Sequence, residues 1–140
     1  MSSWYRRLVL PFSSDLAILL FRVWLGAMMI VHGEGKFLGD ATKLTGTVER
    51  LGFPFPEFFA GAAAFSEFIG GILLILGLLT RPTAALVGIT MAVAAFLRHA
   101  PDPFGKKELA LTYLVMAAVL FLLGPGRYSL DAVLFGRRKS

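Results

Sequence analysis

Residues 58–79 read FFAGAAAFSEFIGGILLILGLL, a stretch in which Glu67 is the single ionisable side chain. A membrane-spanning helix needs about 20 consecutive apolar residues, so this stretch is long enough to cross a bilayer. Three more apolar stretches lie at residues 16–31, 83–97 and 109–123. Their apolar residues form blocks and do not alternate with period two, which excludes a membrane β-barrel. The sequence therefore predicts an all-α, polytopic membrane protein with a four-helix transmembrane bundle.

The composition of the 140-residue chain supports this prediction. Charged residues make up 16% of the chain, whereas a soluble domain keeps about a quarter of its residues charged. The mean hydropathy is +0.72. One bundle would use almost the whole chain, so we expect a single domain over residues 1–140, with spans near 15–36, 57–79, 82–98 and 107–124. A short interfacial helix is expected at 128–135, capped by Ser129.

The charge pattern and the absence of cysteine exclude several classes of function. The net charge is +5, but the basic residues lie at the ends of the apolar stretches and form no continuous stripe, which argues against nucleic acid as a partner. Without cysteine the chain has no disulfides, thiol redox chemistry, iron–sulfur clusters or cysteine-ligated zinc. A redox role would therefore need a bound cofactor or a partner subunit.

Lys and Arg residues near the span ends predict the orientation, because cytoplasmic loops carry an excess of them. With both termini on one side of the membrane, that side holds seven basic residues and the other holds six. The seven are Arg6, Arg7, Arg81, Arg127, Arg137, Arg138 and Lys139, and the six are Lys36, Lys43, Arg50, Arg98, Lys106 and Lys107. This small excess and the basic C-terminal end predict cytoplasmic termini.

Arg22 and Glu67 are the ionisable residues placed deepest in the expected spans. At a rise of about 1.5 Å per residue, they lie within about 5 Å of each other along the membrane normal. The sequence therefore predicts a buried Arg22–Glu67 ion pair. Such a pair could serve only to lock two helices together, or Glu67 could be a proton-relay or quinone-binding carboxylate. A third alternative is that Arg22 extends to the headgroups without a partner.

A second polar cluster is expected near the outer face, from His32, Lys36, His99, Glu108 and Tyr113. His32 and Lys36 are one turn apart, so both could donate hydrogen bonds to a quinone or another small ligand, with Tyr113 as a wall. The two histidines could instead hold a haem, but haem is large for so small a bundle and we do not expect it. A metal held with Glu108 is a weaker alternative, and no metal site is predicted. Ordinary capping at the membrane interface would also explain these residues.

Seven short motifs, in order along nearly the whole chain, resemble those of the DoxX family of small four-helix membrane proteins. They are RVWLG (22–26), HGEGK (32–36), LGFPFP (51–56), EFIGG (67–71), LGLLTR (76–81), ELALTY (108–113) and GPGRYSLD (124–131). The family takes its name from a small subunit of a terminal quinol oxidase. Related proteins take part in thiosulfate:quinone oxidoreduction or belong to membrane complexes that handle oxidative or thiol stress.

The family has no agreed catalytic residues, so the resemblance transfers positions and not roles; these positions are Arg22, His32, Lys36, Glu67 and Glu108. Two classes of function follow. The chain could be a subunit or accessory protein of a quinone-linked redox complex, or a structural or assembly protein with no chemistry of its own. The expected partners are membrane lipid and other membrane or peripheral redox subunits, or a second copy of the chain. The expected location is the cytoplasmic (inner) membrane of a bacterium or archaeon.

Overall fold

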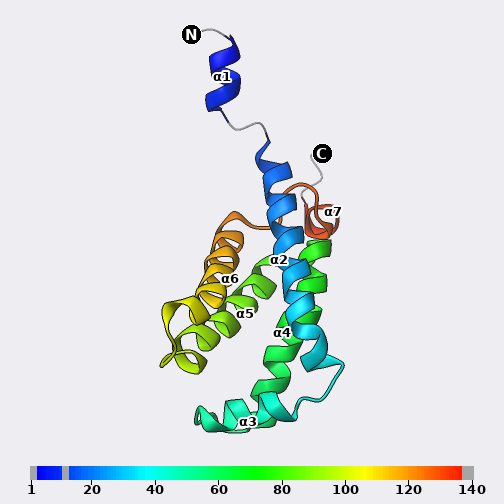
Figure 1. The fold of residues 1–140 in the computed structure, drawn as a ribbon. Helices are drawn as coiled ribbons and strands as arrows, with labels where there is room; N and C mark the ends of the chain where they lie inside the picture. The colour runs from blue at the N-terminus through cyan, green and yellow to red at the C-terminus, as the bar shows by residue number, and fades with distance from the viewer. Residues whose placement is uncertain (1–2, 11–12, 137–140) are drawn as a thin grey trace.

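The computed structural model describes residues 3–10 and 13–136, and no strand is present among them. Figure 1 shows α2, α4, α5 and α6 as a bundle, with α3 lying across one end and α1 extending from the other. The bounds of the elements are α1 Ser3–Val9, α2 Ser14–Phe37, α3 Thr42–Arg50, α4 Pro56–Leu76, α5 Thr80–Val93, the π-helix η1 Ala94–Arg98, α6 Phe104–Leu123 and α7 Leu130–Phe135. The predicted all-α membrane fold is confirmed.

Three helical segments of the described chain are long and apolar enough to cross a membrane: Ser14–Phe37, Pro56–Leu76 and Thr80–Arg98. They correspond to the first three expected spans. The fourth expected span corresponds to α6, which has 20 residues. It carries three charged residues in and just after its first turn, Lys106, Lys107 and Glu108. That α6 crosses the membrane stays a prediction. Arg137, Arg138 and Lys139, which entered the orientation count, lie outside the described residues.

Local sequence explains where the two longest helices begin and end. The hydroxyl of Ser13 accepts a hydrogen bond from the Leu16 amide (3.2 Å) and caps α2. Pro56 stands in the first turn of α4, where its missing N–H costs nothing. Gly77 then ends α4 with a left-handed backbone (φ 69°), which glycine adopts without strain. The expected second span therefore ends three residues earlier than the hydropathy alone predicts.

Helices α2 and α4 pack closely because each presents a glycine to the other. A Cβ placed on Gly26 would lie 2.6 Å from the carbonyl oxygen of Gly71, and a Cβ on Gly71 would lie 2.6 Å from that of Gly26. Small residues at such a crossing allow two membrane helices to approach backbone to backbone. The core continues from this contact through Leu25, Met29, Leu74, Val87, Ala117 and Leu120.

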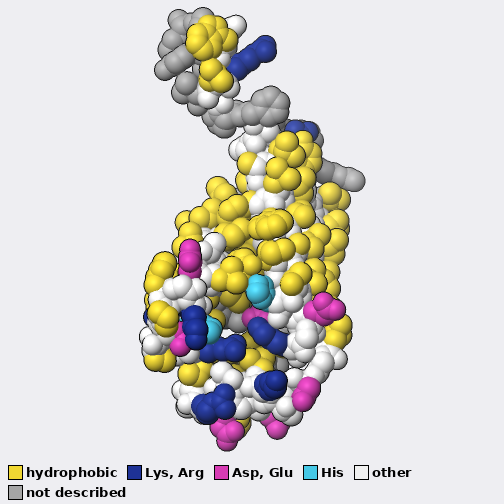
Figure 2. All heavy atoms as spheres, viewed as in Figure 1, with side chains coloured by type: hydrophobic (Ala, Val, Ile, Leu, Met, Phe, Trp, Pro, Cys, Tyr) yellow, Lys and Arg dark blue, Asp and Glu magenta, His cyan; other side chains and the backbone are white. Residues whose placement is uncertain are grey.

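The surface divides into an apolar part and a polar end. In Figure 2, hydrophobic side chains cover much of the upper body of the bundle, whereas charged and histidine side chains gather toward the end where α3 lies. Large apolar residues such as Trp24, Ile89 and Leu122 are 59%, 63% and 75% exposed, which suits a surface that faces lipid. Both termini of the bundle lie at the other end, where the amide of Arg127 donates to Asp15 Oδ1 (3.1 Å).

Candidate functional site

Glu67 pairs with Lys36 and not with Arg22. The Lys36 ammonium lies 2.5 Å from Glu67 Oε2, and the Glu67 side chain is 5% exposed. Lys36 comes from the last turn of α2 and Glu67 from the middle of α4. The predicted Arg22–Glu67 ion pair is therefore wrong, although the prediction that Glu67 is a buried, paired carboxylate agrees with the structure.

The register of α2 against α4 explains the correction. Gly26 lies opposite Gly71, and Glu67 lies one turn from Gly71 on the side away from Arg22. Arg22 itself lies one turn from Gly26 in the opposite direction, so about eight residues, or 12 Å of helix, separate the two side chains. Depth along each separate helix does not determine this pairing, because the Gly26–Gly71 contact sets how far α2 is shifted along α4.

Arg22 lies at the terminal end of the bundle, where it is 1% exposed. Its Nη2 donates to the carbonyl oxygen of Tyr128 (2.6 Å), while Nε and Nη1 have no hydrogen-bond partner in the described part of the chain. The guanidinium occupies the space beside Gly77, where a side chain would collide with it. The glycine that ends α4 thus also makes room for this buried cation.

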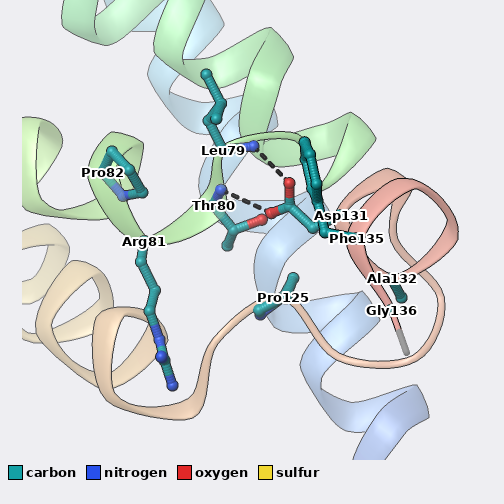
Figure 3. A pocket seen from close by; sticks show the side chains of 9 residues that line it. All are labelled: Leu79, Thr80, Arg81, Pro82, Pro125, Asp131, Ala132, Phe135 and Gly136. Atoms are coloured by element: carbon teal, nitrogen blue, oxygen red, sulfur yellow. Dashed lines mark hydrogen bonds between the residues drawn. The ribbon is translucent and has the colours of Figure 1, made fainter.

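Asp131 joins α7 to the turn between α4 and α5. Figure 3 shows its carboxylate accepting hydrogen bonds from the amides of Leu79 (2.8 Å) and Thr80 (2.9 Å), while its own amide donates to the Gly77 carbonyl (2.9 Å). Burial raises the pKa of Asp131, but the Thr80 and Leu79 amides, with a smaller effect from Arg22, outweigh burial and lower the pKa below its usual value. The carboxylate also caps the N-terminus of α5, which has no capping side chain of its own.

A hollow of about 420 Å³ lies beside Asp131, lined by Thr80, Arg81, Pro82 and Phe135 among others. In Figure 3 the Arg81 side chain points away from Asp131, and both oxygens of the carboxylate are turned toward the α5 amides. The Asp131 carboxylate is therefore already engaged in joining α7 to the turn between α4 and α5. We interpret the terminal end as a structural closure of the bundle.

A second cavity, of about 410 Å³, lies toward the opposite end. Binding sites for small molecules usually measure about 300–1,000 Å³ and are mostly apolar with a few polar groups. The cavity draws on five elements and on the loop before α4. Its apolar walls are Leu44, Val48, Leu51, Phe53, Phe58, Phe59, Ala62, Ala63, Leu86, Ile89, Val93 and Ala94, and its polar residues are Lys36, Thr47, Glu67, Thr90 and Arg98.

The two threonine hydroxyls of the cavity already form hydrogen bonds within the protein; that of Thr47 donates to the Lys43 carbonyl (2.9 Å). The Thr90 hydroxyl is already shared with the Ser66 hydroxyl (2.7 Å) and donates to the Leu86 carbonyl (3.0 Å). The Lys36–Glu67 pair and Arg98 remain as the charged groups of the cavity. Lys36 retains two further N–H donors beyond the one directed at Glu67. The cavity can therefore accommodate an apolar molecule that has oxygen acceptors at its polar end.

The predicted outer cluster is divided among four places. Lys36 lines the cavity, whereas His32 and Tyr113 do not; they form an edge-on ring pair between α2 and α6, with centroids 5.5 Å apart and Tyr113 Oη 3.4 Å from His32 Nε2. His99 Nδ1 lies 2.6 Å from Asp102 Oδ2, a contact that lowers the pKa of Asp102. Glu108 is exposed on α6. The expectation that one cluster unites all five residues is thus wrong.

The histidines and acidic residues offer little to a metal or a haem. Within residues 3–10 and 13–136, no group of three His, Asp or Glu side chains is placed to hold a metal ion. His32 and His99 each have a ring nitrogen directed at a different partner, Tyr113 and Asp102 respectively.

Sequence reasoning missed Arg98 and the face of α3 as parts of the site, because nothing near them in the sequence marks a ligand.

The comparisons with known proteins agree with the motifs. The family model for DoxX matches residues 17–100. The chain is 33% identical to a Bacillus subtilis (strain 168) protein named "Putative oxidoreductase CatD", over 91% of this chain and 94% of that protein. It is 32% identical to the inner membrane protein YqjF of Escherichia coli (strain K12), over 86% and 93%, and 32% identical to the inner membrane protein YphA, over 81% and 87%. No solved structure matches the chain significantly.

Proposed function

This chain belongs to the DoxX family of membrane proteins, and we propose that it binds a quinone as a subunit or accessory protein of a membrane redox complex. The cavity beside the Lys36–Glu67 pair carries this proposal. A quinone is a flat apolar ring with two carbonyl acceptors. Three phenylalanines line the cavity, and the Lys36 ammonium is a donor for one carbonyl oxygen. Glu67 holds Lys36 at this wall and keeps the pair close to neutral.

The cavity also suits a ligand that arrives from the membrane. Phe58 and Ile89 line it and are 69% and 63% exposed, so its walls continue into the lipid-facing surface. An isoprenoid tail could therefore stay in lipid while the ring enters. On the far side, α3 covers the cavity with Leu44, Thr47 and Val48, and none of the α3 residues is fully buried. A weakly packed helix of this kind can move aside at low cost.

The redox role is proposed from the family and from one relative, the protein named "Putative oxidoreductase CatD". The chain has no cysteine, so electrons would come from a partner subunit and not from its own thiols. We place the protein in the cytoplasmic membrane of a bacterium or archaeon, with both termini in the cytoplasm. The cavity then lies in the outer half of the bilayer.

The test is a binding titration on protein in lipid nanodiscs, with a short-chain quinone quantified by equilibrium dialysis. Ala63→Leu places a larger side chain in the cavity, and Ala118→Leu makes the same change at an exposed position of α6. We expect Ala63→Leu to weaken binding at least tenfold, and Ala118→Leu to match the wild type. Absence of binding at millimolar quinone would overturn the proposal and favour a structural or assembly protein.

A further variant separates the cavity from the site first expected at His32. Because His32 pairs with Tyr113 and does not line the cavity, His32→Ala should leave the titration unchanged. Loss of binding in His32→Ala, with Ala63→Leu unaffected, would move the site to the seam between α2 and α6.

A further inference from the structure

The third membrane helix changes from an α-helix to a π-helix within the stretch that lines the cavity. Helix α5 ends at Val93, and η1 continues from Ala94 to Arg98, with the His99 amide donating to the Ala94 carbonyl (3.0 Å). A π turn holds one more residue than an α turn and is frequent at functional sites. No proline or glycine lies in η1 to cause this change. Its consequence is a rotation of the residues that follow.

The rotation exchanges one side chain for another at the cavity wall. At about 100° per residue, the lining residues of α5 and the start of η1 cover an arc of about 140°, centred about 30° from Thr90. In a continuous α-helix Leu97 would lie near the centre of this arc, and Arg98 would lie outside it. One extra residue turns the chain back by about 100° and brings Arg98 to the centre. Arg98 indeed lines the cavity, whereas Leu97 does not line it and is 47% exposed.

Arg98 carries donors that the described part of the protein leaves without a partner. Its side chain forms no hydrogen bond or ion pair with residues 3–10 or 13–136. A guanidinium has five N–H donors and no acceptor. Lys36 and Glu67 largely neutralise each other, so Arg98 gives the cavity a net positive charge. Arg98 thus offers N–H donors to an acceptor oxygen of a ligand that lies near η1.

We propose that Arg98 is the specificity-determining residue of the cavity, selecting ligands with two carbonyl oxygens on opposite edges of the ring. Lys36 on α2 donates to one oxygen and Arg98 on η1 donates to the other. This inference rests on the proposed quinone function and narrows it to para-quinones. A ring with a single carbonyl can accept from only one of the two cations, so it lacks one of the two charge-assisted hydrogen bonds.

The test compares two rigid probes of similar size, 1,4-naphthoquinone with two carbonyls and 1-tetralone with one. Each is titrated against the wild type and against Arg98→Gln in nanodiscs. A charge-assisted hydrogen bond contributes about tenfold or more to affinity, so we expect the wild type to prefer the quinone by about that factor. Arg98→Gln should lose most of this preference through weaker quinone binding, with tetralone binding unchanged.

Two further variants control for charge and for folding. The exchange Leu97→Arg with Arg98→Leu keeps the composition and charge but moves the cation about 100° around the helix, away from the cavity. It should behave like Arg98→Gln. Lys43→Gln removes an exposed cation of α3 that does not line the cavity, and it should keep the preference of the wild type. Arg98 is exposed, so thermal unfolding of these variants should stay close to that of the wild type.

Wild-type preference in both Arg98→Gln and the exchange variant would overturn the inference. If Ala63→Leu still abolished quinone binding in that case, the proposed function would stand without it. Failure of the wild type to bind naphthoquinone at all would overturn the proposed function and this inference together.

Discussion

The contact between Gly26 and Gly71 predicts opposite effects for the same substitution at two glycines of α4. A methyl group on Gly71 would meet the Gly26 carbonyl oxygen at 2.6 Å and the Ile30 amide nitrogen at 3.0 Å. These are backbone atoms, so no rotamer change can relieve the collision and α2 must shift. Overpacking typically costs about 1–3 kcal/mol, and here it opposes a gain of about 1 kcal/mol in helix propensity. We expect Gly71→Ala to lower the free energy of unfolding.

Gly61 provides the matched control. It lies on the same helix, and a Cβ placed on it meets nothing within 4 Å. Gly61→Ala should therefore raise the stability by about 0.5–1 kcal/mol through helix propensity alone. Both variants can be unfolded by titrating sodium dodecyl sulfate into mild detergent, with helix content followed by circular dichroism. Stabilisation by Gly71→Ala of the size seen for Gly61→Ala would refute the described packing of α2 on α4.

Three other substitutions test the polar groups with the same unfolding assay. Lys36→Met should lower the free energy of unfolding by about 3 kcal/mol, because it leaves Glu67 charged and buried. Adding Glu67→Gln should restore most of this stability. No restoration in the double variant would argue against the pairing of Lys36 with Glu67. Arg22→Met should leave the free energy of unfolding within about 1 kcal/mol of the wild type, because the loss of one hydrogen bond is offset by the removal of two buried nitrogens whose N–H groups have no partner. A loss above about 3 kcal/mol would show that those N–H groups have partners. Asp131→Asn should cost about 1–2 kcal/mol at neutral pH. The pKa of Asp131 is lowered in the folded protein, so its contribution to stability is fully present above about pH 4 and is lost as the pH falls through the folded-state pKa. The difference in unfolding free energy between wild type and Asp131→Asn should therefore shrink in acid. A difference that grows in acid would contradict the lowered pKa.

The sequence predicts the helices of this fold well because their ends depend on neighbouring residues. Ser13 and Ser129 cap α2 and α7 as N-cap residues do, and Pro56 opens α4. Four apolar blocks and short connections also predict an antiparallel bundle. Helix ends differ from the prediction by a few residues, as at Gly77.

The pairing of charges was not predictable, since it depends on how one helix is shifted along another. The Gly26–Gly71 contact fixes that shift, and a helical turn of error moves a side chain by about 5 Å. Glu67 could therefore be recognised as a buried, paired residue, while its partner could not be chosen between Arg22 and Lys36. The contact of Asp131 with the α4–α5 turn could not be predicted either, because the two segments lie about fifty residues apart in sequence.

The π turn at η1 was also not predictable from the sequence, and it supports the proposed site at the Lys36 end of the bundle. Its sequence, AAFLR, is compatible with an ordinary α-helix, so tertiary packing must determine the extra residue. At the terminal end, by contrast, Asp131 and the local backbone hold α7, and the two unpartnered donors of Arg22 do not line the hollow there. The unusual backbone of η1 instead brings an unpartnered cation to an apolar cavity. Irregular helical turns are frequent at functional sites, and this contrast supports the proposal that a ligand binds at the Lys36 end.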